Sequence, residues 1–505
     1  MAIRNNNALR AQKMRKLNEL NAEGVQTYGR KFDRTHKAAE LVSQYEYLEA
    51  GQEAEAEVRV CGRIMHQRFS WTFVDLADST GSVQLYFDKT KLDPESVRLL
   101  KLLDRGDLIG VKGRAVRTKH GPASVLVESW EILAKSLQSL PEDPSVMNDT
   151  ELRYRNRHLD LILRDAARDV LRKRSQTISA MRRFLDDRDF LEIETPILQT
   201  QACGAEAKPF VTHHNALDID MHLRIAPEFY LRRLLVGGIE RVYEIGKNFR
   251  NEGVSSRHNP EFTSIELFQA YSDYNELMDL TESMLRHVST KVCGSAKVMY
   301  QGVELDFGQP FVRIRMNDAI KNVCGVDVDA IENADEMRAV AIQLGVRLSD
   351  EDTKGEISYA IFEQKVEATL IQPTFVTEYP VEVCFCQHLH PERPEYADRF
   401  ELYVFGRELA NGCSELNDPK EQKRRYEAQA RKREMGHDEI PAPDLEFLLA
   451  MEYGMPPMMG LGIGIDRLVM FLVDAASIRD VVAFPTMKPL PRVKELPEPE
   501  IRDVG

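Results

Sequence analysis

The chain has 505 residues, of which 43% are hydrophobic and 29% charged, with 28 Gly and 23 Pro. This composition is typical of a folded protein of roughly two to four domains and excludes a fibrous or low-complexity chain. No run approaches the roughly 18 uncharged apolar residues of a membrane-spanning helix, because the most apolar stretch, 461–473, contains Asp466 and Arg467. The formal net charge of −14 argues against indiscriminate binding to polyanions.

The N-terminal region differs from the rest of the chain in its charge. Residues 1–37 carry nine Lys and Arg against three Asp and Glu. This segment is interpreted either as a contact for nucleic acid or as the solvated face of a helix, and we assign 1–50 to a helical basic segment with a break near Gly24 and Gly29. The first residues lack the apolar core of a secretory signal, and seven Cys without framework spacing fit a reducing compartment, so a cytoplasmic location is expected.

From residue 54 the sequence changes to short segments in which apolar and polar residues alternate, and these segments predict strands. AEVRVCGRIM, WTFVDLAD, SVQLYFDK, DLIGVKGRAVR and SVLVESWEIL are separated by Gly, Asp and Ser. Five such strands in about eighty residues favour a small closed barrel of the OB type, which presents a face to oligonucleotides, although a small sandwich would fit the pattern nearly as well. We assign 51–140 to this domain.

A polar linker with two Pro follows, SLPEDPSVMNDTELR, and we place the start of a second domain, 141–505, within it. A long helix is predicted over 165–187, followed by the strand-like FLEIETPIL. Helices and strands then mix without regular alternation, which favours an α+β domain on a mainly antiparallel sheet. A polar helix over 419–435 is expected to cross the surface as an appendage.

The densest chemical signal lies in YEIGKNFRNEGVSSRHNPEFTSIELFQAYSDY, residues 243–274. Two predicted strands flank a polar loop, so that Arg250, Glu252, Arg257 and His258 gather around one turn. Several cations in one loop suit a polyphosphate, because the Arg fork matches phosphate oxygens. Each of these residues alone could also form a surface ion pair.

Two further segments extend this signal. MGLGIGIDRLVMFLVD has G-x-G-x-G spacing outside any βαβ unit, so a dinucleotide fingerprint is rejected, and Arg467 is left to face the same anion. RFELYVFGRELANGCSELND carries Glu401, Glu408 and Glu415. Carboxylates near a polyphosphate indicate a bound Mg²⁺, since hard oxygen ligands suit that cation.

These three blocks, together with FLEIETPIL, resemble motifs 1, 2 and 3 of the class II aminoacyl-tRNA synthetases. RNEGVSSRHNPEFT with NGCSELND resembles the lysyl-tRNA synthetases of the bacterial type, and the similarity covers nearly the whole chain. The resemblance implies an antiparallel-sheet catalytic domain with an N-terminal OB-type anticodon-binding domain. It also implies a lysine–tRNA ligase with ATP, L-lysine and tRNA(Lys) as substrates and Mg²⁺ as cofactor.

The resemblance also assigns roles to single residues. Arg250 would be the catalytic residue that neutralises the α-phosphate and orients the amino-acid carboxylate. The remaining ATP contacts would be Glu252, Arg257, His258, Phe262 and Arg467, with Glu401 and Glu408 at the metal positions. Glu266 and Glu415 would receive the lysine ammonium, and the other lysine contacts would be Gly204, Glu228, Phe268, Asn411 and Cys413.

The chain departs from the family pattern at three places. Phe268 stands where the bacterial pattern usually has Tyr, and Cys413 where it usually has an aromatic residue. Losing one hydrogen bond to a charged group costs roughly 1.5 to 3 kcal/mol, so a weaker or differently tuned lysine site is expected. The third departure is CFCQHLH, whose Cys384, Cys386, His388 and His390 would share one face of a strand. Four such residues cannot readily wrap a tetrahedral zinc ion, so a local structural role is favoured.

In the N-terminal barrel the resemblance places Phe73, Gln84 and Glu131 against the anticodon bases, with a core position as the alternative for Phe73. Motif 1, around Pro196, implies a symmetric homodimer. Two other functions remain open at this stage. One is a ligase that attaches lysine to a translation factor, and the other is a non-catalytic RNA-binding relative of a synthetase.

Overall fold

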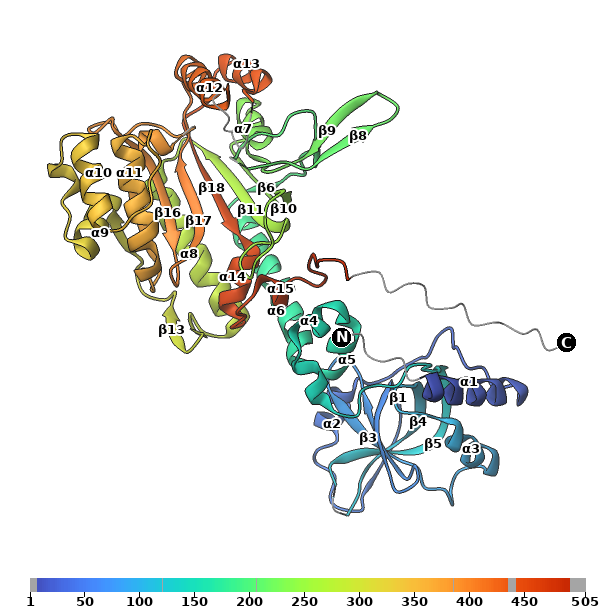
Figure 1. The fold of residues 1–505 in the computed structure, drawn as a ribbon. Coiled ribbons are helices and arrows are strands. Elements are labelled where there is room, and N and C mark those ends of the chain that lie inside the picture. The colour runs from blue at the N-terminus through green and yellow to red at the C-terminus, as the bar shows by residue number, and fades with distance from the viewer. Residues whose placement is uncertain (1–6, 120, 206, 385, 435–441, 491–505) are drawn as a thin grey trace. The chain divides into compact units, whose positions relative to one another are not determined.

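The computed structural model describes residues 7–119, 121–205, 207–384, 386–434 and 442–490 (Figure 1). The chain divides into two compact units, unit 1 (Met1–Leu159) and unit 2 (Asp160–Gly505). The domain limits expected at residues 50 and 140 stay predictions. Within the described part of the chain, no helix combines the length and the apolar composition needed to cross a membrane.

Five strands of unit 1 close into a ring in the order β1-β2-β3-β5-β4. β1 pairs antiparallel with both β2 and β4, while β3 and β5 are parallel. Alternate residues point inward, and Val58, Val74 and Ile109 are among the side chains that fill the ring. The five predicted strands are confirmed as β1 (Glu53–Arg68), β2 (Phe73–Ala77), β3 (Ser82–Tyr86), β4 (Leu108–Arg117) and β5 (Ala123–Ala134).

The helices of unit 1 are short apart from the first. The predicted break is confirmed, because α1 ends at Ala22 and Gly24 adopts a φ of 74°, which a glycine accommodates without strain. Asp93 caps α3 by accepting a hydrogen bond from the Ser96 amide. The helices are α1 (Asn7–Ala22), α2 (Ala38–Gln44), α3 (Pro94–Leu99), α4 (Thr150–Arg155) and α5 (Arg157–Leu163), the last of which crosses the division between the units.

A cluster of ionic side chains fixes α1 to unit 1. The fully buried Lys135 ammonium lies 2.6 Å from Asp104 Oδ2 and 2.7 Å from Asp107 Oδ2. Lys16 of α1 is 2.7 Å from the other Asp104 oxygen, and Lys13 donates to two backbone carbonyl oxygens. Two cations of the basic N-terminal segment therefore serve the fold of unit 1.

Unit 2 is built on an eight-stranded sheet in the order β14-β15-β16-β17-β18-β11-β10-β6 (Figure 1). Only the outermost pairs, β14 with β15 and β6 with β10, are parallel, so the expectation of a mainly antiparallel sheet is confirmed. The strands are β6 (Leu191–Glu192), β10 (Arg241–Phe249), β11 (Glu261–Ala270), β14 (Val312–Arg315), β15 (Thr374–Pro380), β16 (Tyr396–Tyr403), β17 (Glu408–Ser414) and β18 (Met458–Gly464).

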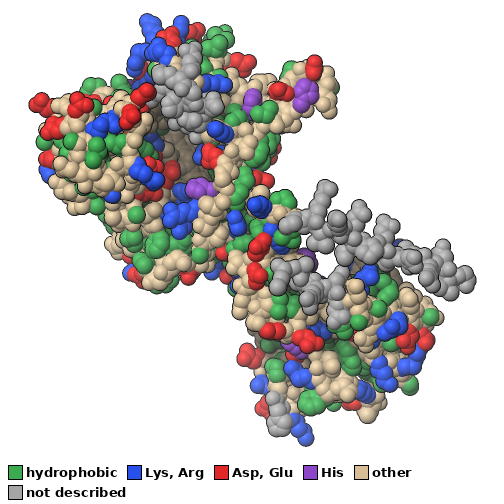
Figure 2. Space-filling view, in the orientation of Figure 1, with side chains coloured by type: hydrophobic (Ala, Val, Ile, Leu, Met, Phe, Trp, Pro, Cys, Tyr) green, Lys and Arg blue, Asp and Glu red, His purple; other side chains and the backbone are tan. Residues whose placement is uncertain are grey.

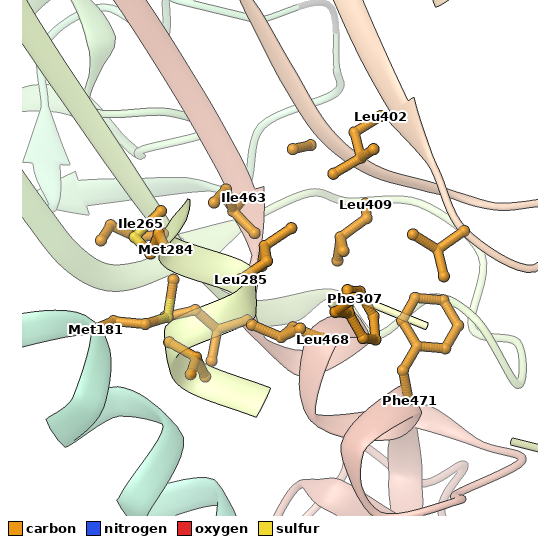
Figure 3. Packing of buried hydrophobic residues seen from close by; sticks show 14 of the residues in the cluster. Met181, Ile265, Met284, Leu285, Phe307, Leu402, Leu409, Ile463, Leu468 and Phe471 are labelled. Carbon is orange, nitrogen blue, oxygen red and sulfur yellow. The ribbon is translucent and has the colours of Figure 1, made fainter. Parts of the chain in front are cut away.

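One face of this sheet carries the main core of unit 2. Helices α6 (Asp165–Asp186), α8 (Tyr274–Cys293) and α14 (Ile465–Leu472) pack their apolar side chains against it. Ile265 and Ile463 project from neighbouring strands onto Met284 and Leu285 of α8 (Figure 3). Because successive strand residues alternate between faces, Glu266 and Phe268 of β11 turn to the opposite face.

The remaining elements surround the sheet. Strands β7 (Leu198–Gln199), β8 (Val211–His214) and β9 (Ile219–Leu223) form a separate small sheet, and β12 (Lys297–Tyr300) pairs with β13 (Val303–Asp306). The other helices are α7 (Glu228–Val236), α9 (Met316–Cys324), α10 (Ala334–Gln343), α11 (Lys354–Ile361), α12 (Pro419–Glu434), α13 (Leu445–Glu452) and α15 (Ile478–Val481).

Two local expectations are wrong in part. FLEIETPIL forms only the two-residue strands β6 and β7, with irregular backbone between them. The polar helix α12 is not a free appendage, because Gln422, Arg425 and Tyr426 are buried and Arg425 donates to the Gln387 carbonyl oxygen at 2.9 Å. Met435, the last residue expected in this helix, lies outside the described residues.

Candidate active site

A cavity of about 480 Å³ opens on the face of the sheet opposite the main core. Figure 2 shows a hollow in this unit with acidic and basic side chains around it. The structure brings together at this cavity all the candidate residues that the sequence placed in unit 2: Gly204, Glu228, Arg250, Glu252, Arg257, His258, Phe262, Glu266, Phe268, Glu401, Glu408, Asn411, Cys413, Glu415 and Arg467.

Strand register explains why segments far apart in the chain meet here. Phe268 of β11 and Cys413 of β17 are both opposite Gly460 of β18. Glu266 and Asn411 are both opposite Gly462, two residues further along the same strand. A methyl group at Gly460 would overlap the Phe268 ring and the carboxylate of Glu415. The glycine spacing of β18 therefore makes room for side chains from both neighbouring strands.

Three carboxylates gather at one end of the cavity. Burial raises the pKa of Glu266 well above its usual value, and the nearby charge of Glu228 adds to this effect. Burial likewise raises the pKa of Glu228, and it raises that of Glu415 to about 8. Because burial is the main cause of these shifts, the ionised form of the three acids is poorly solvated, and a cationic ligand would stabilise that form.

Arg232 of α7 is the cation that the structure places against this group. Its Nη1 donates to Glu228 Oε1 at 3.0 Å and lies 3.0 Å from Glu415 Oε2. Among the described residues no hydrogen bond reaches that Glu415 oxygen, although it is buried. The pocket therefore keeps an acceptor that a donor on a ligand could fill.

Two thiols line the same end of the cavity. Cys386 donates to Glu228 Oε1 at 3.2 Å, and Cys413 lies beside Glu415. Burial raises the pKa of both thiols far above the usual range, so they remain neutral. Ligand atoms of Glu228, Cys386 and Glu415 all lie within 4.8 Å of one another, but the Arg232 guanidinium already occupies the position of a cation there.

The expectation of a regular strand through CFCQHLH is wrong. In the described part of this segment the pairing is limited to isolated bridges, Gln387 with Glu415 and Leu389 with Ala397. Cys386 is buried in the cavity, whereas His388 is exposed, so the side chains do not share one face. The bridge between Gln387 and Glu415 places the preceding residue, Cys386, in the pocket.

The opposite end of the cavity is cationic. The Arg250 guanidinium lies 5.2 Å from the centre of the Phe262 ring, and its buried Nε has no hydrogen-bond partner among the described residues. Arg257 and His258 are exposed on the loop between β10 and β11. Although His258 is exposed as a residue, partial burial of its imidazole lowers its pKa, and the charge of Arg467 lowers it further.

Ser255 and Asp466 position these cations. The Ser255 hydroxyl accepts hydrogen bonds from the amides of Arg257 and His258, at 3.1 and 3.0 Å. Asp466, the second residue of α14, pairs with Arg174 and accepts from the Thr263 amide at 2.8 Å. The adjacent Arg467 lines the cavity, where its guanidinium donates to the Glu408 carbonyl oxygen and lies 3.9 Å from the Glu408 carboxylate.

Glu401 and Glu408 form a second acidic group on β16 and β17. Glu401 is buried and accepts hydrogen bonds from Arg399, Tyr379 and Tyr403. Burial raises the pKa of Glu408, and the charge of Glu401 raises it further. Both carboxylates line the cavity and supply the hard oxygen donors that fit a divalent cation such as Mg²⁺.

The candidate residues of unit 1 are only partly brought together. Phe73 lies on the outer face of the ring, not in its core, and stacks on Tyr86 with ring centres 5.2 Å apart. Gln84 is on the same face of the neighbouring strand β3, because Phe73 pairs with Tyr86 and Asp75 with Gln84. Glu131 is exposed on β5, and the residue opposite it belongs to β4.

Three residues in or next to the cavity have roles that the sequence did not predict. Arg232 could have been found from its spacing of four from Glu228 on a helix, which places the two side chains on one face. The buried Asn248 donates to Ser264 at 2.7 Å, across the pair β10 and β11, but nothing in the local sequence marks this contact. The role of Cys386 depends on a long-range bridge and has no local signal.

Comparison with known proteins gives matches in both units. Residues 149–488 match the family described as tRNA synthetases class II (D, K and N), and residues 58–133 match the OB-fold nucleic acid binding domain. A lysine–tRNA ligase from Carboxydothermus hydrogenoformans is 47% identical over 485 residues, which cover 96% of this chain and 98% of the relative. Relatives of the same name from Clostridium perfringens and Synechococcus sp. are 48% and 47% identical, over 95% of this chain and 96% and 99% of their own lengths.

Proposed function

The chain belongs to the class II tRNA synthetases of the D, K and N group, and we propose that it activates L-lysine with ATP and attaches the lysyl group to the 3′ end of tRNA(Lys). The observation that carries this proposal is the cavity itself. Three carboxylates, the buried Glu415 and the partly buried Glu228 and Glu266, lie at one end of it, and Arg250 and Arg467 lie at the other. An amino acid with two ammonium groups and a nucleotide triphosphate match these two ends.

The cationic end is the proposed site of ATP. Arg257, His258 and Arg467 would hold the phosphates, while Phe262 stacks on the adenine and Glu252 contacts the nucleotide. The loop that carries Arg257 and His258 is fixed by Ser255, so the donors are held in place before the nucleotide binds. Mg²⁺ held by Glu401 and Glu408 would neutralise charge on the phosphate chain.

The acidic end is the proposed site of lysine. Glu266 and Glu415 would receive the side-chain ammonium, and Glu228 with the backbone at Gly204 would receive the α-ammonium. Phe268, Asn411 and Cys413 complete the wall around the aliphatic stem. A neutral amino acid would leave a buried carboxylate unpaired at a cost of roughly 3 to 5 kcal/mol, so lysine is selected without an editing step.

In the proposed reaction a carboxylate oxygen of lysine attacks the α-phosphorus of ATP. A new oxygen–phosphorus bond forms, the bond to the pyrophosphate breaks, and pyrophosphate leaves with the electron pair. Arg250 stabilises the negative charge that develops on the α-phosphate and holds the lysine carboxylate in line. In the second step a ribose hydroxyl at the 3′ end of the tRNA attacks the lysyl carbonyl, and AMP leaves.

Unit 1 is the proposed anticodon-binding part. The outer face of its ring exposes Phe69 and stacks Phe73 on Tyr86, which forms an aromatic surface suited to unpaired bases. Gln84 lies beside this surface and would add polar contacts, and Glu131 remains a predicted contact. The match to an OB-fold nucleic acid binding domain over residues 58–133 supports this assignment.

A symmetric homodimer is also proposed. Near Pro196, the apolar side chains of Ile197, Leu198 and Val211 are exposed in the single chain. Apolar residues exposed together in this way are typical of a protein interface. A cytoplasmic location, expected from the sequence, stays a prediction.

The two other functions are less well supported. A ligase acting on a translation factor has no use for an aromatic surface suited to unpaired bases, such as the stack of Phe73 on Tyr86 in unit 1. A non-catalytic relative has no need for Arg250, Glu401, Glu408 and Arg467 around one cavity, yet all four are there.

The test is ATP–pyrophosphate exchange measured with each of the twenty amino acids, followed by charging of bulk tRNA. Lysine alone is expected to support exchange, and tRNA is expected to accept the lysyl group. Exchange with another amino acid would contradict the lysine assignment. Exchange with lysine without charging of tRNA would favour the protein ligase, and no exchange with any amino acid would favour the non-catalytic relative.

A further inference from the structure

Arg232 is fully buried at the acidic end of the cavity and is not among the residues assigned above to a substrate. It projects from α7 and pairs with Glu228, one turn earlier on that helix, and with Glu415, which follows β17. Its other terminal nitrogen donates to the Leu416 carbonyl oxygen at 2.8 Å. One guanidinium thus joins two of the three pocket acids, which come from distant segments of the chain.

The formal charges of the pocket indicate what this pairing does. Glu228, Glu266 and Glu415 carry three negative charges when ionised, and Arg232 supplies one positive charge. The neighbouring thiols of Cys386 and Cys413 stay neutral, since burial raises their pKa. Two other cations act on Glu266: Arg224, which pairs with Glu244, and Arg250, which is assigned to the carboxylate of lysine. Two negative charges of the ionised acids are then left for the two ammonium groups of lysine.

We propose that Arg232 sets the charge of the amino-acid pocket: by neutralising one of its three carboxylates it matches the pocket to a substrate with two ammonium groups. It acts through Glu228 and Glu415, so it is a positioning residue and does not take part in the chemistry. This inference rests on the proposed activation of lysine.

The pH dependence of lysine binding is the signature of this role. The charged and titratable groups that face Glu415 are Arg232 and Glu228 of α7, Cys413 of β17, and Cys386. Burial raises the pKa of Glu415 to about 8, and Arg232 acts against this rise. An ionised Glu415 is needed to receive an ammonium group, so the KM for lysine should fall as the pH rises through about 8. Without Arg232 this midpoint should move to higher pH.

The experiment measures pyrophosphate exchange with lysine from pH 6.5 to 9.5 for the intact protein and for Arg232→Gln, Arg232→Lys and Arg233→Gln. The control residue Arg233 is the neighbour of Arg232 on α7 and pairs with Asp444 and Glu446, which do not line the cavity. At pH 7, Arg232→Gln should raise the KM for lysine about tenfold or more, with the KM for ATP unchanged and the pH midpoint higher. Arg232→Lys keeps the charge and should retain the original midpoint, and Arg233→Gln should leave all three quantities unchanged.

A folded Arg232→Gln variant with an unchanged midpoint would overturn the inference, as would a KM for lysine no higher than that of Arg233→Gln. Should Arg232→Gln fail to fold, a shifted midpoint in a folded Arg232→Lys variant would overturn it, and an unshifted midpoint would support it. Exchange by the unsubstituted protein separates this test from the proposed function. If that protein does not activate lysine, the proposed function fails, whereas activation with no effect of Arg232 contradicts the present inference alone.

Discussion

Unit 1 and unit 2 each bury a cluster of ionic side chains, and the two clusters differ in their balance. In unit 1, Lys135 lies between Asp104 and Asp107, and Lys16 pairs with the remaining oxygen of Asp104. Burial acts to raise the pKa of Asp104, but hydrogen bonds from Lys135 and Lys16 outweigh it, so the pKa is lowered. Asp107 also accepts from two backbone amides.

In unit 2, Arg232 pairs with two of the three pocket carboxylates, Glu228 and Glu415, while Arg224 and Arg250 act on the third, Glu266. Burial raises the pKa of all three carboxylates, and these arginines only partly oppose this effect. Burying either cluster costs free energy, but only in unit 1 are the buried negative charges fully paired by cations of the protein itself. The difference separates a cluster that supports the fold from one that is completed by a ligand.

The largest expected effect comes from removing a charge of the uncompensated cluster. Glu266→Gln should raise the KM for lysine more than about 100-fold, because an ammonium group would lose a buried partner worth roughly 3 to 5 kcal/mol. The protein should lose no stability, since the substitution lowers the excess of negative charge. Pyrophosphate exchange and a thermal melt measure the two effects.

A matched control is Glu261→Gln on the same strand. Glu261 is exposed, pairs with Lys247 and does not line the cavity. The Glu261→Gln substitution should leave the KM for lysine unchanged. Equal effects of the two substitutions would contradict the assignment of Glu266 to the amino-acid pocket.

Removing a charge from the balanced cluster of unit 1 should instead lower stability and leave lysine binding unchanged. Lys135→Met leaves Asp104 and Asp107 without a buried partner and should destabilise unit 1 by roughly 3 to 5 kcal/mol. The KM for lysine should not change. Both tryptophans of the chain, Trp71 and Trp130, are in unit 1, so their fluorescence during denaturant unfolding reports on this unit.

Lys112→Met serves as the control for this measurement. Lys112 is a partly exposed residue of the same ring whose ion pair with Glu57, at 2.8 Å, is open to solvent, so its loss should cost less than about 1 kcal/mol. A loss of stability from Lys135→Met no larger than that of Lys112→Met would show that the cluster does not support the fold.

The comparison also shows which features could be predicted from the sequence. The strands of unit 1 and the pair β10 and β11 follow from alternating apolar residues and turn signals, which are local. The pocket residues were found because their motifs resemble a known family. The bridge from Gln387 to Glu415, the burial of Arg425 and the charge balance at Arg232 were not found. Each depends on contacts between segments far apart in the chain, which local patterns do not encode.

The smallest expected effect concerns the neutral wall of the pocket. The Phe268 ring and the Glu415 carboxylate both border Gly460, so a hydroxyl added to this ring would enter the acidic end of the cavity. Phe268→Tyr should therefore lower the KM for lysine about tenfold, as one hydrogen bond to a charged group contributes roughly 1.5 kcal/mol. The KM for ATP should stay the same, because Phe268 is at the opposite end from Arg250 and Arg467. An unchanged KM for lysine in pyrophosphate exchange would show that the wall at Phe268 does not tune the pocket, and that its affinity is set by the acids and Arg232 alone.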